Sequence, residues 1–491
     1  MNRKQEVMNN KKGITARMFF VFCFLFFSAT FLLFFRLGST TLTNWDEAWL
    51  ASVSQDIAVR GDWLGGQWNG QTWFYEPPLV TWSLAVLYKI FGPSEFWLRS
   101  LNAVLGFLTI VVVSKLSALI SKSAKSALIS VIILLSDIEF LFRSRQINVE
   151  IPVTFFLVFT LYAAIKTLSS PQRKWWIVAG IFLGFAFLTK RASPMLIFPA
   201  ILITVIKALS PLRREASRNL YKKNVILMIA VFFAIAAPWY FFSYLRFGNQ
   251  FINEFFLGYT LGKIRSINPG AGTDIWFYIT ALRHSFKLWF PLIPLAIIWA
   301  TVKSLRDQKI AILTILIWTF LIFLTLAPIK SSWFLLPAHP ALAILTGLLV
   351  TDLVKFTKLH NRLRGLTNFS TVAVMMSIII AAWQIWNYRY DFIVPNTTGH
   401  QAALAKLAGK LSSPDKSIYL DDDYLPVAVF YSQRRVIPLR FNRLQSITPL
   451  PVSPGSYILT NDETLSTLKS NYSNITLVNQ ISDLILVQNQ P

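Results

Sequence analysis

Two adjacent carboxylates, Asp46 and Glu47, stand in the segment TNWDEAWLAS, just after an apolar run long enough to cross a bilayer. A carboxylate at such a position can accept the proton of an attacking hydroxyl group, which is general-base chemistry. Tryptophans flank the pair on both sides, at Trp45 and Trp49. The pair is therefore the first candidate for a reactive site.

A purely structural interpretation of the same segment is also open. Apolar residues recur at i+4 steps, which predicts a short helix lying in the membrane interface with these residues on one face: Trp45, Trp49, Val53 and Ile57. Asn44 would then cap the helix, Glu47 would complete a capping box, and Asp46 would favour the helix dipole.

Other ionisable side chains are predicted to lie at the same membrane face. Glu76 follows Tyr75 and precedes two prolines, and charged residues end later apolar runs in RSRQINVEIP, LTKRAS and APIKSSWF. Cations at the ends of spans often only extend toward the headgroups. The candidates outside the acidic pair are Tyr75, Glu76, Arg145, Glu150, Lys190, Arg191 and Lys330.

Acids and cations gathered at one membrane face suit a lipid-linked sugar donor, whose phosphate lies at headgroup depth. Transfer of its sugar needs a base for the incoming hydroxyl and cations for the departing phosphate. We assign Asp46 as the base, with Glu47 beside it. The predicted phosphate contacts are Arg145, Lys190, Arg191 and Lys330, and the predicted cavity residues are Trp45, Tyr75, Glu76 and Glu150.

Composition places these residues in a polytopic α-helical membrane protein. The 491 residues are 54% hydrophobic and only 14% charged. The net charge of +24 comes without a nucleic-acid-binding motif, so no nucleic-acid partner is expected. Cys23 is the only cysteine, which excludes an intramolecular disulfide, and the four histidines lack zinc-ligand spacing.

The apolar runs predict about eleven spans, with 11–13 open. Basic residues gather in alternate loops, which places the N-terminus in the cytoplasm and the acidic pair outside. The predicted spans are about 17–37, 97–118, 126–142, 151–167, 175–189, 192–207, 224–243, 285–302, 310–327, 333–353 and 368–386.

These spans divide the chain into a transmembrane domain, 1–386, and an extracytoplasmic region, 387–491. The first domain has two long outer loops, 38–96 and 244–284, and the first loop is expected to form interface helices because it lacks a spanning apolar run. The C-terminal region is expected to be a small soluble α/β domain. Its predicted elements are a helix at HQAALAKLAGKL and strands at KSIYL, RRVIPL, GSYILT and NITLV.

With these motifs in place, the chain resembles the C-type-fold membrane glycosyltransferases, in the group of protein O-mannosyltransferases and lipid-A aminoarabinose transferases. The resemblance runs over about residues 15–350. It is carried by NWDEAWLA, YEPPLVTWSLAVLYKIFG, RSRQINVEIPVTFFLVFTLYAA, GIFLGFAFLTKRASP, APWYFFSYLRFG and KSSWFLLPAHPALAIL.

The resemblance implies inverting transfer from a polyprenyl-phosphate sugar on the extracytoplasmic side, with Asp46 as base, Glu47 in support and a variable, non-catalytic C-terminal domain. Three positions depart from the family pattern: Glu76 replaces a lysine, Glu150 replaces an aspartate, and Arg191 replaces a glycine. Some members also have a histidine in the second outer loop, and the segment INPGAGTDIWFYI of that loop has none. A bound metal is therefore doubtful, although Glu47 and Glu76 could hold a divalent ion.

Three other functions remain open at this point. A transporter or flippase of a lipid-linked sugar would need ionisable groups near mid-membrane. An O-antigen-type polymerase or ligase would rely on arginine and histidine in a large outer loop, and a scaffold would use the acids only as helix caps. Besides membrane lipids and the donor, the expected partner is an acceptor lipid, glycan or protein; the sugar and prenyl length stay open.

Overall fold

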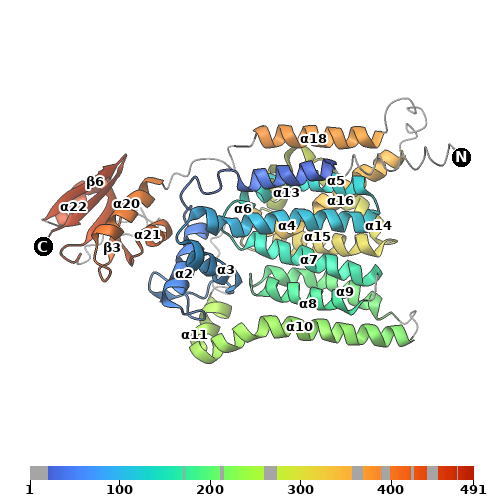
Figure 1. The fold of residues 1–491 in the computed structure, drawn as a ribbon, viewed down its shortest axis with the longest axis horizontal. Coiled ribbons are helices and arrows are strands. Elements are labelled where there is room, and N and C mark those ends of the chain that lie inside the picture. Colours follow the sequence, from blue (N-terminus) through green and yellow to red (C-terminus); the bar gives the residue numbers. More distant parts are fainter. Residues whose placement is uncertain are drawn as a thin grey trace.

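The computed structural model describes residues 20–169, 172–210, 215–258, 274–356, 369–387, 389, 399–421, 425–439, 452–472 and 474–490. Long helices run side by side in one bundle, and a small sheet lies beyond one end of it (Figure 1). Five helices in these ranges are long and apolar enough to cross a membrane, and one bent pair adds a sixth. The predicted fold class, a polytopic helical protein with a C-terminal α/β part, is confirmed.

Helical structure occurs within each of the eleven predicted spans. The helices of the bundle are Phe20–Phe34, α4 (Glu95–Ser121), α5 (Ala124–Leu135), α6 (Ile138–Ser144), α7 (Glu150–Ser169), α8 (Arg173–Phe187), η1 (Ser193–Ile197), α9 (Phe198–Ala208), α10 (Glu215–Phe247), α13 (Phe277–Phe286), η3 (Lys287–Trp289), α14 (Leu292–Ser304), α15 (Gln308–Leu326), η4 (Ser332–Ala338), α16 (His339–Phe356) and α18 (Phe369–Asn387).

Two of the predicted spans are broken rather than continuous. The span at 126–142 divides into α5 and α6, because the Asp137 side chain accepts a hydrogen bond from the backbone N–H of Phe140 and caps a new helix. The helical segments before and after Pro291 meet at a bend of 102°. Proline has no backbone N–H group, so it removes one hydrogen bond of the helix at this point. Each break turns a single apolar run into two shorter elements.

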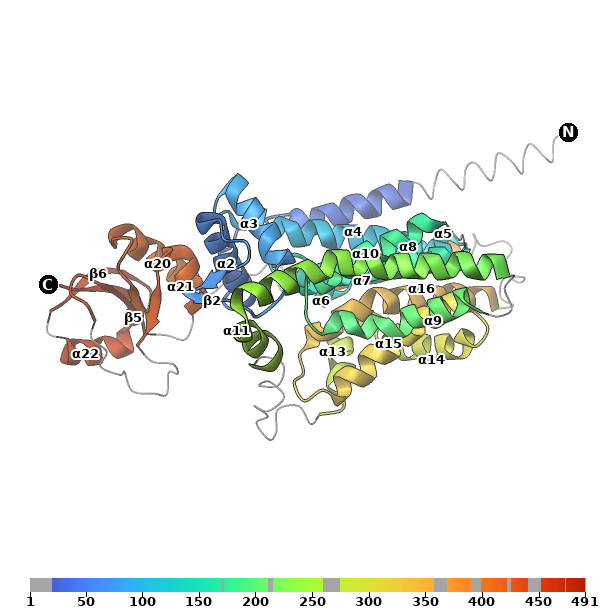
Figure 2. The same ribbon diagram turned by 90° about the horizontal axis from the view of Figure 1, so that it is seen from below.

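Two glycines bring α8 and α10 into close contact. A Cβ on Gly180 would lie 2.5 Å from the carbonyl oxygen of Met228, and one on Gly184 would lie 2.8 Å from Cβ of Ile235. Four-residue spacing of small residues is a common device for close packing of membrane helices. In Figure 2 α10 crosses the face of the bundle that contains α7 and α8.

The first predicted outer loop forms short elements at the same end of the bundle as the sheet (Figure 1). These are α2 (Asp46–Arg60), β1 (Gln67–Trp68), β2 (Gln71–Thr72) and α3 (Leu79–Phe91). None of them reaches the length of a span. The chain continues on this side with α11 (Asn249–Phe251) and the π-helical turn η2 (Ile252–Gly258) at the start of the second loop.

The expected capping box of α2 is wrong. The residue before the helix is Trp45, and no side chain caps the N-terminus. Asn44 instead binds the C-terminal region, where its Oδ1 accepts a hydrogen bond from the backbone N–H of Val427 at 3.1 Å. The expected membrane-facing stripe is also wrong, because Val53 and Ile57 are buried against aromatic side chains within the loop.

The C-terminal region is a mixed five-stranded sheet with the strand order β4-β3-β5-β7-β6. Strand β3 pairs in parallel with β4 and β5, whereas β7 pairs antiparallel with β5 and β6. Helices α20 and α21 contribute to one hydrophobic cluster on the sheet and α22 to another. The elements are α20 (Gly399–Leu411), β3 (Ile418–Leu420), α21 (Leu425–Ser432), β4 (Val436–Pro438), β5 (Tyr457–Asn461), α22 (Asp462–Asn471), β6 (Ile475–Ile481) and β7 (Leu484–Asn489).

This region packs directly on the first loop. The Tyr431 hydroxyl donates to Oε1 of Glu95 at 2.8 Å and accepts from the backbone N–H of Leu42 at 2.9 Å. Asn69 exchanges two 2.8 Å hydrogen bonds with the backbone of Val436. A buried apolar cluster joins side chains of both parts, so the sheet holds the loop that contains the acidic pair.

Candidate active site

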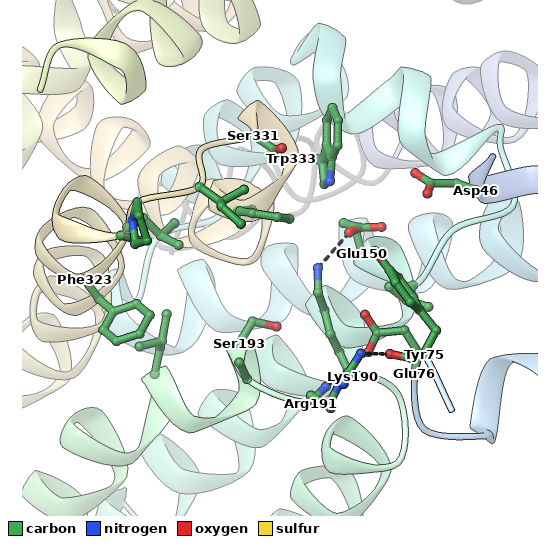
Figure 3. A pocket seen from close by; sticks show the side chains of 18 of the residues that line it. Asp46, Tyr75, Glu76, Glu150, Lys190, Arg191, Ser193, Phe323, Ser331 and Trp333 are labelled. Carbon is green, nitrogen blue, oxygen red and sulfur yellow. Dashed lines mark hydrogen bonds and ion pairs between the residues drawn. The ribbon is translucent and has the colours of Figure 1, made fainter. Parts of the chain in front are cut away.

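A cavity of about 660 Å³ opens between the first loop and the ends of α7, α8 and α15. One end has ionisable side chains, and the other is apolar and contains Phe323 of α15 (Figure 3). Six of the ten predicted site residues line it: Asp46, Tyr75, Glu76, Glu150, Lys190 and Arg191. The first turn of α2 thus brings Asp46 to residues more than 100 positions away along the chain.

Asp46 faces this cavity with its carboxylate available. Half of its side chain is exposed, and Oδ2 lies 3.6 Å from a guanidinium nitrogen of Arg143. Its recessed position raises the pKa of Asp46, the negative charge of Glu150 raises it further, and Arg143 acts in the opposite sense. A carboxylate with a raised pKa is a stronger proton acceptor than an ordinary surface aspartate.

Arg143 is a site residue that the sequence analysis did not select. Its Nε donates to Oε1 of Glu139 at 3.0 Å, and its guanidinium lies 4.2 Å from the ring centroid of Trp333. These two contacts fix the cation beside Asp46. The signal available in the sequence was its i,i+4 spacing from Glu139, which is also typical of an ordinary surface pair.

Glu47 does not reach the cavity. It is 1% exposed, and both of its oxygens accept from the Arg99 guanidinium at 2.8 Å. The same carboxylate accepts from the backbone N–H groups of Thr43 at 2.8 Å and Ile147 at 3.0 Å. Burial opposes ionisation, but Arg99 and these donors lower the pKa of Glu47, so it is a fixed anion that joins three segments.

Glu150 and Lys190 form a buried ion pair in the wall of the cavity. Lys190 Nζ lies 2.7 Å from Oε1 of Glu150, and Figure 3 shows the pair between Asp46 and Arg191. Oε2 of Glu150 has no hydrogen-bond partner among the described residues. The ammonium group is 5.0 Å from the ring centroid of Phe334, where the polar and apolar parts of the cavity meet.

Glu76 and Arg191 close the same end of the cavity. Burial raises the pKa of Glu76, while Arg191 and Lys190 act in the opposite direction. The net effect is a pKa above the ordinary value of a glutamate. Arg191 donates to the backbone carbonyl oxygens of Tyr75 and Phe255, which ties the segment before the two prolines to the second loop.

The other predicted site residues lie outside the cavity lining. Arg145 donates to the carbonyl oxygens of Leu32 and Phe35, and Lys330 donates to those of Thr325 and Ala327. Both cations therefore satisfy carbonyls at the ends of helices. Trp45 is exposed next to Asp46 and makes an edge contact with Trp49.

A metal-binding cluster would need three or more His, Cys, Asp or Glu side chains close together. The described part of the chain contains no such group. Of the two acids considered for a metal, Glu47 is bound by Arg99 and Glu76 lies in a different environment, at the cavity.

Comparison with known proteins agrees with this architecture. Residues 75–242 match the family described as dolichyl-phosphate-mannose-protein mannosyltransferase. A crystal structure of ArnT from Cupriavidus metallidurans bound to undecaprenyl phosphate superposes with a TM-score of 0.75, covering 95% of this chain and 98% of that one at 16% identity. A crystal structure of the Archaeoglobus fulgidus oligosaccharyltransferase superposes with a TM-score of 0.52. The match covers 95% of this chain and 73% of that one, at 12% identity.

Curated relatives show the same pattern in sequence. An undecaprenyl phosphate-alpha-4-amino-4-deoxy-L-arabinose arabinosyl transferase of Serratia proteamaculans is 24% identical over 73% of this chain. An uncharacterized protein of Aquifex aeolicus is 26% identical over 64% of it. The matches span 64% and 61% of these relatives, so the chain spans less than two thirds of their length.

The resemblance seen in the sequence is thereby confirmed. The chain has the fold of the C-type membrane glycosyltransferases and is a multi-pass membrane protein. It is similar to the aminoarabinose transferases and to the O-mannosyltransferase family.

Proposed function

We propose that this protein transfers a sugar from a polyprenyl-phosphate donor to an acceptor hydroxyl on the extracytoplasmic side of the membrane, with inversion at the sugar. The observation that carries the proposal is the cavity itself. It places an accessible carboxylate, Asp46, and a buried cation, Lys190, next to an apolar compartment lined by α15. A lipid with a phosphate head has this division into charged and apolar parts.

In the proposed reaction the acceptor oxygen attacks the anomeric carbon of the donor. The bond between that carbon and the phosphate oxygen breaks, and polyprenyl phosphate leaves with the electron pair. Asp46 takes the proton from the acceptor hydroxyl, and Lys190 stabilises the charge on the departing phosphate. Arg143 orients Asp46, while Glu47 holds the loop from which Asp46 projects.

The topology is part of the proposal. Concentration of lysine and arginine in alternate loops supports a cytoplasmic N-terminus and an outer position for the cavity and for the α/β domain at 387–491. Residues 1–386 would then form the transferase domain. Sugar, acceptor and prenyl length are left open by these features.

The test is transfer of radiolabelled sugar from undecaprenyl-phosphate donors by the purified protein, with extracted envelope lipids, glycans and proteins as acceptors. We expect Asp46→Asn to bind undecaprenyl phosphate normally and to lose about 10²–10⁴-fold in transfer rate. Asp56→Asn, on the same helix but outside the cavity lining, is the matched control and should transfer normally. Near-normal transfer by Asp46→Asn would refute the assignment. Movement of intact donor across vesicles without transfer would favour the flippase alternative.

A further inference from the structure

Asp137 and His339 form a pair inside the helix bundle that the proposed reaction does not use. Nδ1 of His339 lies 2.7 Å from Oδ2 of Asp137, and both side chains are buried. Both residues fall within predicted spans, where ionisable side chains are rare and usually have a function. The pair therefore needs an explanation beyond the packing of two helices.

Both carboxylate oxygens of Asp137 are bound by groups of the protein. Oδ1 accepts hydrogen bonds from the backbone N–H of Phe140 at 3.2 Å and from the Ser285 hydroxyl, and Oδ2 contacts His339. A carboxylate occupied in this way has little capacity left for a ligand. It instead holds together the elements that supply its partners, which are α6, α13 and α16.

The residue before Asp137 holds the same break between α5 and α6. The Ser136 hydroxyl accepts from Nε1 of Trp289 at 2.9 Å, and its carbonyl oxygen accepts from Nε2 of Gln384 at 2.6 Å. Elements η3 and α18 thus add to the contacts at this point. The start of α6 is therefore fixed from several sides.

The Asp137–His339 pair joins two short helical elements that also meet at their other ends. Asp137 caps the start of α6, and Arg143 lies six residues further on, about 9 Å along the helix axis. His339 follows η4 directly, and Trp333, which lines the cavity (Figure 3), lies six residues before it. The Arg143 guanidinium lies 4.2 Å from the Trp333 ring centroid. One contact at each end therefore fixes α6 and η4 relative to each other.

We infer that Asp137 and His339 are positioning residues of the transferase site, and that their contact holds Arg143 in place beside Asp46. The inference rests on the proposed role of Asp46 as the base and adds how that base is kept in its setting. Arg143 lies 3.6 Å from Oδ2 of Asp46, so a small displacement of α6 would change this contact.

A change at Arg143 can be measured at Asp46. Burial raises the pKa of Asp46, the charges of Glu150 on α7 and Glu47 on α2 also raise it, and Arg143 on α6 and Lys190 after α8 lower it. Displacement of Arg143 would remove one of the two lowering effects. Asp46 would then take up its proton at a higher pH.

The experiment uses the purified full chain in detergent and has two readouts. The first is the reaction of Asp46 with a water-soluble carbodiimide and an amine, which requires a protonated carboxyl group, followed across pH by mass spectrometry of the peptide. The second is sugar transfer from an undecaprenyl-phosphate donor as a function of pH. Binding of undecaprenyl phosphate is measured alongside.

The variants separate positioning from general packing. His339→Leu removes the contact with Asp137, whereas His339→Asn keeps an amide N–H group close to the position of Nδ1. Ser126→Ala is the matched control, because it breaks a buried 2.9 Å contact with Thr351 between α5 and α16, the same two helices, at a distance from the cavity.

We expect His339→Leu to move the midpoint of carbodiimide labelling to higher pH by about half a unit and to lower the transfer rate roughly tenfold. Undecaprenyl phosphate binding should stay normal. His339→Asn should restore most of both values, and Ser126→Ala should match the wild type. Ser285→Ala should move the midpoint in the same direction and keeps the test valid if His339→Leu does not fold.

The link to Arg143 is tested by combining variants. Arg143→Gln should move the labelling midpoint of Asp46 to higher pH, and adding His339→Leu to it should move the midpoint no further. Additive shifts in the double variant would overturn the inference.

Two other results would also overturn it. One is a His339→Leu protein that melts at a lower temperature but keeps the wild-type labelling midpoint, which would make the pair a brace of the bundle only. The other is an equal shift in Ser126→Ala. A shifted midpoint in a protein that transfers no sugar would support the positioning role and count against the proposed function, so the two failures are distinguishable.

Discussion

Replacing Glu47 by glutamine should destabilise the protein, although the residue stands next to the proposed base. The side chain is 1% exposed and forms a bidentate pair with Arg99, which is itself 4% exposed. Removing one partner of a buried ion pair leaves the other charge unpaired and costs about 3–5 kcal/mol. Because Glu47 also accepts from Thr43 and Ile147, we expect the upper part of that range.

The assay is thermal unfolding of the purified protein in detergent, with Asp46→Asn as the neighbouring control. Asp46→Asn removes the same charge from a half-exposed side chain and should unfold within about 0.5 kcal/mol of wild type. The double variant Glu47→Gln/Arg99→Met should lose less stability than the two single changes added together. Wild-type stability of Glu47→Gln, or simple additivity in the double variant, would refute the structural role assigned to this pair.

Three further predictions follow from the same site. Only the ionised form of Asp46 accepts a proton, so its raised pKa should make the transfer rate fall, on acidification, at a higher pH than an ordinary aspartate would give. Glu150→Gln removes one cause of the raised pKa. In a pH–rate profile, the residual activity of this variant should therefore fall at a lower pH than the activity of the wild type. Lys190→Met should weaken undecaprenyl phosphate binding by about 10–100-fold in a titration, whereas Lys330→Met, which removes a helix-capping cation, should not. Asn44→Ala should lower the free energy of unfolding by about 1 kcal/mol and raise the rate of amide hydrogen exchange at the start of α21. Unchanged exchange there would count against docking of the C-terminal sheet through this residue.

The bundle and the C-terminal elements were largely predictable because they depend on local patterns. Long apolar runs locate the spans, and the helix and first four strands of the C-terminal region fall at the predicted segments. Helices α21 and α22 were not predicted, and strand β7 was missed as well. It follows β6 after only two residues, and Ser482 in this turn has φ 57° without the glycine or asparagine that usually signals such a hairpin.

Pairing between distant residues could not be predicted in the same way. Arg99 lies 52 residues after Glu47, and a local capping box explained the acid equally well from sequence. Arg145 and Lys330 were expected at the phosphate because each stands at the end of a span. Backbone carbonyls left free at the end of a helix compete for the same cations, and in this structure they hold both of them.

The two acids at the start of α2 have different tasks because the chain is fixed on both sides of Asp46. Asn44 is bound to the C-terminal region and Glu47 to Arg99, and Trp45 between them has φ 66° and ψ −110°. A bulky residue in such a conformation costs about 1–3 kcal/mol and persists only where its surroundings hold it. The hydrogen bonds that Glu47 accepts contribute enough free energy to offset that cost. The strained turn thus directs one carboxylate into the core and leaves the next free to face the cavity, which explains why the acids are adjacent.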